Sequence, residues 1–444
     1  MGTLRFAHPD MDWILMWVGL EPDPSLRVAA TAGSGDTGQH MSPPPPSPTA
    51  SPLRLTVTLC LAEVLTMVGV FAFPALLPGF MVEWQLSNTD AGWISGIYFA
   101  GYALSVPLLV SLTDRVDARL IYVASAGVTA LSSFGFALVA EGFWSALALR
   151  ALAGVGLAGT YMPGLRVLVD RYRGRAEARA IGFYTASFSL GTSLSFLAVG
   201  LLAGLFGWRW AFASAGVLAL AAVVLVVATL PATRPHAPPE RARLLDFRPV
   251  LRNRPAMGYV LAYGLHTGEL FALRSWLVAF LAFSAVLTGA DPGLLTPTAV
   301  ATLSGLVAMA ASIGGNEVAE RYGSRRVVAV AMVLSAAVAC GVGFSAPLAY
   351  GWVVAVVLLY SVTVQADSAA LTAGAVATAE PGRRGATLAV HSLVGFTGGF
   401  IGPLLFGVIL DASGNGAVLA WGSAFAVIGL LTLFGPLLLW VLRR

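Results

Sequence analysis

Apolar runs of about 20 residues recur along the chain and are separated by short polar segments. A helix of about 20 apolar residues is long enough to cross the hydrocarbon core of a bilayer. Each run therefore predicts one membrane-spanning helix. The twelve runs cover residues 55–80, 91–111, 120–140, 143–168, 180–206, 210–230, 257–283, 297–318, 327–345, 348–372, 386–410 and 417–441.

The polar segments between the runs alternate between arginine-rich and arginine-poor. With the N-terminus inside, the inner segments hold twenty arginines and the outer segments hold one, Arg209. Positive residues accumulate in cytoplasmic loops, so the bias predicts a multi-pass protein of the plasma (inner) membrane with both termini cytoplasmic. The inner arginines are Arg54, Arg115, Arg119, Arg171, Arg173, Arg175, Arg179, Arg234, Arg241, Arg243, Arg248, Arg252, Arg254, Arg321, Arg325, Arg326, Arg383, Arg384, Arg443 and Arg444.

The longest inner connection divides the chain into two halves with six runs each. We expect an N-terminal six-helix bundle at 53–230, a cytoplasmic linker at 231–256 and a C-terminal six-helix bundle at 257–444.

The first 52 residues are rich in Pro, Ser, Gly and Thr and include "SPPPPSPTASP". Such a stretch cannot bury a core, so residues 1–52 predict a disordered cytoplasmic tail. Met41 offers a second start, which would leave residues 1–40 untranslated.

The composition agrees with a membrane protein, because 57% of the 444 residues are hydrophobic and only 11% are charged. Soluble domains carry about 25% charged residues. The net charge of +4 comes from loop arginines and does not indicate a nucleic acid partner. Cys60 and Cys340 lie in apolar runs, so we expect no disulfide, no metal site and no cofactor.

Two patterns repeat between the halves. An acid, an arginine and a second arginine recur after the second run of each half with an offset of 206 residues, and a longer pattern recurs with an offset of 204. The repeat predicts an all-α membrane protein whose twelve helices form two pseudo-symmetric six-helix bundles. The first pattern consists of Asp114, Arg115 and Arg119 and of Glu320, Arg321 and Arg325. The second consists of Arg179, Gly191, Ser195 and Phe196 and of Arg383, Gly395, Gly399 and Phe400.

Residues 53–442 resemble the major facilitator superfamily of secondary transporters. The resemblance is carried by "DRVDAR", "ERYGSRR", "RALAGVGLAG", "RAIGFYTASFSLG", "GWRWAF" and "GFIGPLLFG". It implies a monomeric transporter that works by alternating access on a small solute. Asp117 replaces the glycine of the family's loop signature, and Val110 replaces a second glycine. Ser195-Phe196 replaces the Gly-Pro of the antiporter signature, which disfavours a drug antiporter.

The six loop residues of the first repeat pattern, including Asp114, are expected to gate the conformational change. Charges at helix ends can pair in one conformation and separate in the other. The alternative is that these residues only hold the loops inside.

The fourth run contains an arginine followed by small residues. Gly154, Gly156 and Gly159 are expected to let a neighbouring helix approach closely. Arg150 lies within the span and must face a polar cavity or a partner. It would serve substrate or proton coupling, or else form a fixed structural ion pair.

The seventh run carries His266, Glu269 and Arg274 within an arc of about 140° on a helix. Glu63 lies 206 residues before Glu269. The two acids are therefore expected near the pseudo-symmetry axis, where such transporters hold their cargo. The alternatives are that the acids only make hydrogen bonds with His266 or Arg274, or that the register is coincidental.

Asp367 and His391 also lie within predicted spans, and Gln365 and Ser368 add polar neighbours to Asp367. Both residues are expected on the substrate or proton pathway. The alternative for Asp367 is a solvated position near the inner end of its helix.

These residues favour a secondary active transporter that is coupled to protons, because a carboxylate in a partly desolvated cavity can load and release a proton. Arg150 and Arg274 suit a small organic anion as the substrate. A proton-coupled drug exporter is the first alternative. A membrane-embedded enzyme or receptor is the second, although the sequence has no nucleophile constellation or metal-type cluster to support it.

Overall fold

The computed structural model describes residues 52–113, 115–172, 175–232, 247–381, 383–413 and 418–443. These residues are predominantly helical, and no strand occurs among them. Several sequence predictions fall outside the described residues: the tail apart from Pro52, residue Asp114, the part of the linker at 233–246, and the inner arginines Arg173 and Arg444.

Within these ranges, eleven helical segments are long and apolar enough to cross a membrane. They match the second to twelfth predicted runs, with shifts of a few residues at their ends. The segments are α5 (Asn88–Leu112), α6 (Ala118–Val139), α7 (Phe143–Arg171), α8 (Arg175–Phe206), α9 (Trp208–Thr229), α11 (Arg254–Thr288), α12 (Pro297–Tyr322), α13 (Ser324–Val342) with η2 (Gly343–Ser345), α14 (Tyr350–Gln365) with α15 (Ser368–Ala377), α16 (Arg384–Ala412), and α17 (Val418–Thr432) with α18 (Phe434–Val441).

The first predicted run forms three short helices rather than one long helix. These are α2 (Pro52–Met67), α3 (Ala72–Ala75) and α4 (Leu77–Glu83). Proline lacks the N–H that continues a helical ladder, and this stretch holds Pro74 and Pro78. The linker is also partly helical, since α10 (Arg248–Arg252) precedes α11.

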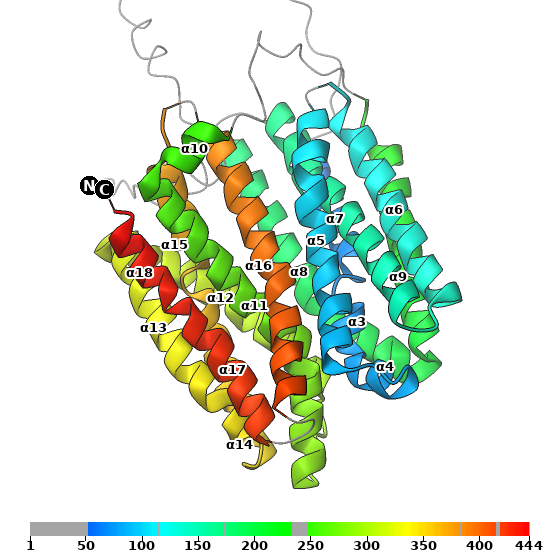
Figure 1. Cartoon of the computed structure of the whole chain (residues 1–444). Coiled ribbons are helices and arrows are strands. Elements are labelled where there is room, and N and C mark those ends of the chain that lie inside the picture. Colours follow the sequence, from blue (N-terminus) through cyan, green and yellow to red (C-terminus); the bar gives the residue numbers. More distant parts are fainter. Residues whose placement is uncertain are drawn as a thin grey trace, which may run out of the picture.

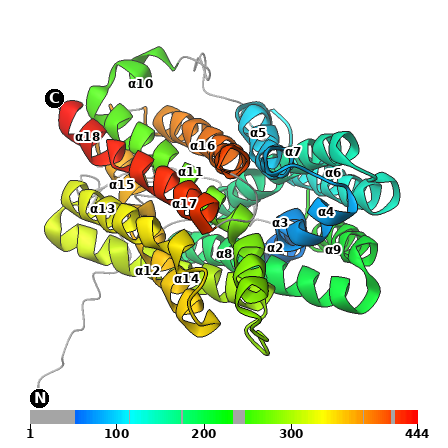
Figure 2. The same cartoon turned by 60° about the horizontal axis from the view of Figure 1, so that its bottom comes forward.

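The helices of the N-terminal half lie on one side of the molecule and those of the C-terminal half on the other, in both views (Figures 1 and 2). We call the end near α10 the upper face and the end near α4 the lower face, as they stand in Figure 1. The halves are joined mainly by α5 packing on α16 and α8 packing on α12, with smaller contacts of α3 and α4 on α11.

Large apolar side chains cover much of the outside of the helices. Leu104, Leu138, Trp144 and Val286 are each more than three-quarters exposed. Aromatic rings such as Trp276, Phe406 and Phe425 are fully buried in the interior. A helix that is apolar on both its buried and its exposed faces suits a surrounding of lipid rather than water.

The three glycines of α7 lie where other helices approach closely. A Cβ added at Gly154 would overlap the backbone carbonyl of Tyr98 on α5, and one added at Gly156 or Gly159 would overlap Thr129 or Ser125 on α6. These glycines let α5, α6 and α7 pack at short range.

Replacing Gly154 with alanine should therefore destabilise the N-terminal half. The added methyl group must push α5 away from α7, and overpacking of this kind costs about 1–3 kcal/mol. Gly127→Ala on α6 is the matched control, because a Cβ there meets nothing within 4 Å. The midpoint of thermal unfolding in detergent should fall for Gly154→Ala and stay unchanged or rise for Gly127→Ala. Equal midpoints would contradict the close packing of α5 on α7.

Candidate functional site

The break between α2 and α3 leaves backbone carbonyls without their helical partners. Pro74 has no N–H to pair with the Val70 carbonyl one turn earlier. Arg150 on α7 supplies the missing donor, since its Nη2 lies 2.8 Å from Val70 O and its Nη1 lies 3.3 Å from Gly69 O. A buried carbonyl without a partner is costly within a membrane, so this contact stabilises the break.

Ser195 on α8 satisfies the other side of the break. Its hydroxyl donates to Val68 O at 2.6 Å and accepts from the Phe71 N–H at 3.1 Å. Ser195 stands where the antiporter signature has its Gly-Pro. The departure from the family pattern therefore provides a side chain that holds the broken segment.

Arg150 is 2% exposed, and its guanidinium also lies 4.3 Å from the centre of the Tyr98 ring. Its contacts are two carbonyls and an aromatic face rather than a carboxylate. Among the residues that the structure describes, Arg150 makes no ion pair, and its guanidinium instead binds the backbone carbonyls of the break.

Phe71, the last residue of the break, belongs to a chain of ring contacts that reaches the C-terminal half. Its ring stacks on Phe196 at 4.8 Å between centres and lies 6.5 Å from Phe99. Phe99 in turn lies 4.0 Å from Phe271 of α11. The broken segment thus contacts an aromatic cluster that bridges the two halves.

Arg274 on α11 reaches the same place from the other half. Its guanidinium lies 5.7 Å from the centre of the Phe71 ring. No hydrogen bond or ion pair of Arg274 occurs with any described residue. A guanidinium within a membrane-spanning helix normally has a polar partner. Its five donors are therefore available to an anion.

Glu63 and Glu269 lie deep within separate halves. Glu63 Oε2 accepts a hydrogen bond from Tyr184 at 2.8 Å, and Glu269 Oε1 accepts from Ser335 and Tyr360 at 2.8 Å each. The two carboxylates are 0% and 3% exposed. Their hydrogen bonds remain within their own halves, so the acids share a chemistry without sharing a site in this conformation.

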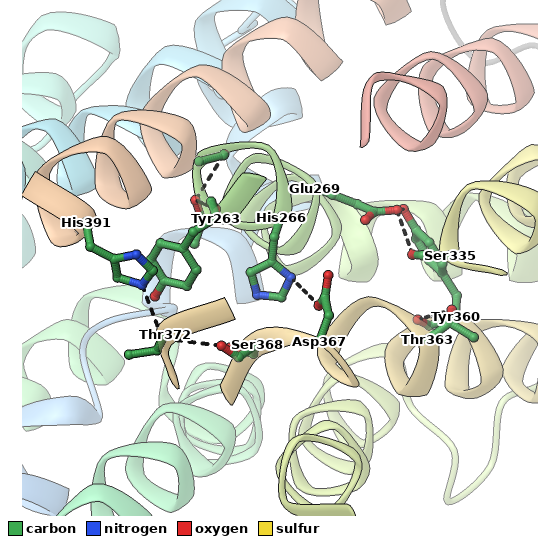
Figure 3. A network of polar contacts seen from close by, with 12 residues as sticks. Tyr263, His266, Glu269, Ser335, Tyr360, Thr363, Asp367, Ser368, Thr372 and His391 are labelled. Carbon is green, nitrogen blue, oxygen red and sulfur yellow. Dashed lines mark hydrogen bonds and ion pairs between the residues drawn. The ribbon is translucent and has the colours of Figure 1, made fainter. Parts of the chain in front are cut away.

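His266 and Asp367 form the most direct pair of titratable groups in the C-terminal half (Figure 3). His266 Nδ1 lies 2.8 Å from Asp367 Oδ1. Asp367 stands at the interruption between α14 and α15 and is 2% exposed. It is therefore a buried residue rather than the solvated one that the sequence left open.

His391 completes this network on α16. Its Nε2 lies 3.1 Å from the Thr372 hydroxyl, and its ring stacks on Tyr263 at 3.8 Å between centres. Tyr263 also lies 5.7 Å from the His266 ring (Figure 3). Two buried imidazoles therefore flank one phenol.

The three polar residues of α11 consequently face three different neighbours. His266 faces Asp367, Glu269 faces Ser335 and Tyr360, and Arg274 faces Phe71. Among the residues that the structure describes, Glu269 makes no hydrogen bond or ion pair with His266 or Arg274.

The loop charges lie at the upper face. Arg115, Glu320, Arg321 and Arg325 are exposed. Arg119 donates to the carbonyl of Val227, near the end of α9, at 2.8 Å. Asp117, the departure from the family's glycine, caps α6 by accepting from the Arg119 N–H at 2.9 Å.

Asp411 is a contact between the halves that the sequence analysis missed. Its Oδ1 accepts from the backbone N–H and the side-chain amide of Asn88, at 3.1 and 2.8 Å. Its Oδ2 accepts from the backbone N–H and the hydroxyl of Thr89, at 2.8 and 2.6 Å. The carboxylate of α16 thereby caps the N-terminus of α5 at the lower face. A lone acid at a span end in an arginine-poor segment was the signal available in the sequence.

The contacts between halves concentrate toward the lower face. Along α5 and α16, they run from Asn88 with Asp411, through Gly92 with Pro403 and Gly96 with Phe400, to Tyr102 with Phe396. This conformation is therefore closed at the lower face.

Apolar membrane-length helices with a broken segment between two halves are the architecture of a secondary transporter. The chain belongs to the Major Facilitator Superfamily, because the model of that family matches residues 59–366 and 290–444.

Two relatives illustrate the similarity. The protein spinster homolog 3 of Danio rerio is 23% identical over 220 residues, which cover 48% of this chain and 44% of that protein. The chain thus spans less than half the length of that relative. Monocarboxylate transporter 11 of Homo sapiens is 29% identical over 376 residues, 84% of this chain and 72% of that protein.

A solved structure has the same fold. It is a bacterial homolog of the human lysosomal transporter spinster in an inward-facing and occupied conformation, with a TM-score of 0.66 and 17% identity. The match covers 88% of this chain and 96% of that chain. The family match and the eleven apolar segments among the described residues together identify a multi-pass membrane protein.

Asp411→Asn should loosen the closure of the lower face. The asparagine amide replaces an accepting oxygen with a donor and removes the charge that favours the helix N-terminus. With Cys60 and Cys340 replaced by serine, a reporter Leu404→Cys lies against Gly92 of α5. We expect its labelling by a maleimide to become roughly tenfold faster, as a loss of about 1.4 kcal/mol gives.

Asp291→Asn provides the control for this experiment. Asp291 accepts a hydrogen bond from the backbone N–H of Gly293 within its own loop. In the Asp291→Asn variant, the Leu404→Cys reporter should be labelled at the same rate as in the parent protein. Equal rates for Asp411→Asn and the parent would show that Asp411 does not hold the two halves together.

Proposed function

We propose that the protein is a proton-coupled secondary active transporter that moves a small organic anion by alternating access. The observation that carries the proposal is the free guanidinium of Arg274 beside Phe71. The bound anion would lie at the break of the first segment, between the two halves. Its carboxylate would accept two parallel hydrogen bonds from the planar guanidinium, and its apolar body would contact the aromatic cluster.

The proposed function fits an architecture of twelve crossings in two bundles. Helices α2, α3 and α4 together form the first of twelve crossings, and the halves 53–230 and 257–444 are two six-helix bundles joined by the linker at 231–256. Their rocking about the site would expose it alternately on the two sides. The protein would work as a monomer in the plasma (inner) membrane.

The orientation comes from the arginine bias. The arginine-rich upper face is then cytoplasmic, together with both termini. Because the lower face is closed by the contacts of α5 with α16, the conformation described would then be closed on the outer side of the membrane. Arg115, Arg119, Glu320, Arg321 and Arg325, with Asp114, would gate the cytoplasmic side in the opposite conformation.

The coupling proton would use the buried titratable groups. Glu63, Glu269, the pair His266–Asp367 and His391 are candidates, since each is at most 3% exposed and can change its charge. An organic anion is also favoured by the name of one relative, a monocarboxylate transporter. A cationic drug is disfavoured by the unpaired arginine, so the exporter remains the weaker candidate.

Uptake into proteoliposomes tests the substrate class. Labelled lactate, succinate and uridine would be offered with the interior alkaline. We expect uptake of an organic acid and not of uridine. Arg274→Gln should abolish that uptake, and Arg274→Lys should raise KM roughly tenfold or more, because an ammonium ion cannot bind a carboxylate in two places.

Arg209→Gln is the matched control, since Arg209 also lies over an aromatic ring, 4.3 Å from the centre of Trp208, but is exposed. Uptake by this variant should equal that of the parent. Uptake of uridine alone, or unchanged uptake of the acid by Arg274→Gln, would exclude an anion site at Arg274.

A further inference from the structure

We propose that proton binding at His266 and anion binding at Arg274 are linked, which makes the protein a proton–anion symporter. This inference rests on the proposed anion site and assigns the coupling to one imidazole. The geometry that carries it is the His266–Asp367 pair, at 2.8 Å, together with a second imidazole nitrogen that has no partner.

His266 is held in one orientation. With Asp367 ionised, the proton between the two groups is on Nδ1, because two unprotonated acceptors at 2.8 Å would repel each other. Nε2 points away from Asp367 (Figure 3). It is buried and has no hydrogen-bond partner among the described residues.

Protonation changes what this nitrogen offers. In the neutral imidazole, Nε2 is a bare acceptor, and the pair with Asp367 carries a net charge of −1. In the imidazolium ion, Nε2–H is a donor, and the pair is neutral. A proton therefore removes a negative charge from the interior and adds a donor, and both changes favour an anion nearby.

Arg274 lies close enough to respond to this change. The two residues are eight positions apart on one continuous helix, which corresponds to about 12 Å along its axis. Charges at this separation interact through an apolar interior much more strongly than through water. Thermodynamic reciprocity then requires that a bound anion also strengthens proton binding by the same factor. We expect that factor to be about tenfold, within the range usual for coupled sites.

The other titratable groups around His266 are less suited to this role. On α11, Tyr263 stacks on the imidazole, and Glu269 accepts two hydrogen bonds from hydroxyl groups. On α16, His391 faces Tyr263 and a threonine hydroxyl rather than a carboxylate. From the N-terminal half, the phenols of Tyr102 and Tyr161 face Tyr263.

The proton transfer needs no further reactant. A proton from water on the open side adds to the Nε2 lone pair, the anion binds, and the halves exchange conformation. The proton and the anion then leave to the other side. No bond between heavy atoms forms or breaks.

The test uses the full-length protein and labelled lactate. In purified protein, lactate affinity should rise about tenfold as the pH is lowered. Lactate added to weakly buffered protein should cause proton uptake. In proteoliposomes, an inwardly directed proton gradient should drive accumulation of lactate.

His266→Gln keeps a polar side chain but cannot titrate at this pH. It should lose gradient-driven accumulation and the proton uptake, yet retain exchange of lactate across the membrane. Glu141→Gln, at an exposed loop position, is the control and should behave as the parent. Asp367→Asn supplies an independent test if His266→Gln does not fold, because removal of the negative charge should make lactate affinity high at every pH.

The outcomes separate the two proposals. Absence of lactate binding by the parent protein contradicts the anion site itself and the linkage with it. Binding that depends on Arg274 but shows the same pH dependence in the parent, His266→Gln and Asp367→Asn overturns the linkage alone.

Discussion

The structure depends on how the break in the first segment is satisfied. A membrane interior offers no water to unpaired carbonyls, so a helix can be interrupted there only where other groups bond to the freed atoms. Pro74 leaves the Val70 carbonyl without its helical donor, and Arg150 and Ser195 bond to the carbonyls of Val68, Gly69 and Val70. With the break stabilised in this way, Phe71 reaches the interface between the halves. The anion site we propose exists only because this backbone is held open.

At the lower face, unpaired backbone groups also find a side-chain partner, and here the partner comes from the other half. The N-terminus of α5 presents N–H groups that lack helical partners, and Asp411 of the other half accepts from them. The interaction is strong but local, because it involves one carboxylate at a helix end. A contact of this kind can be exchanged for water when the halves separate, whereas the apolar packing within each half persists. The alternating access that we propose would require this difference between a breakable contact between halves and a stable contact within them.

Much of the fold could be predicted from the sequence because lipid imposes a simple pattern. Eleven of the twelve predicted runs form the expected segments, since apolar length alone determines a crossing. The broken first segment was not predicted, because its run is equally apolar and a proline alone does not mark a break: Pro107, Pro163 and Pro403 lie inside continuous helices. The six-helix halves and the cytoplasmic termini remain predictions based on the repeat and the arginine bias.

A helical wheel of α11 predicts that its polar residues share a face, but it does not predict their partners. The polar arc of His266, Glu269 and Arg274 indicated a polar face, yet each residue contacts a different part of the chain. Partners such as Tyr184 and Tyr360 come from distant parts of the chain, so no local pattern could have shown them. Ser195 was read as a departure from a family signature, and its role at the break is visible only in three dimensions.

The most direct measurement is a structure of the protein with an iodinated carboxylate, such as 4-iodobenzoate, located by its anomalous signal. The account predicts the iodine among Phe71, Phe99 and Phe271, with the carboxylate within hydrogen-bond distance of the Arg274 guanidinium. A ligand bound elsewhere in the protein, or Arg274 paired with a carboxylate of the chain itself, would contradict it.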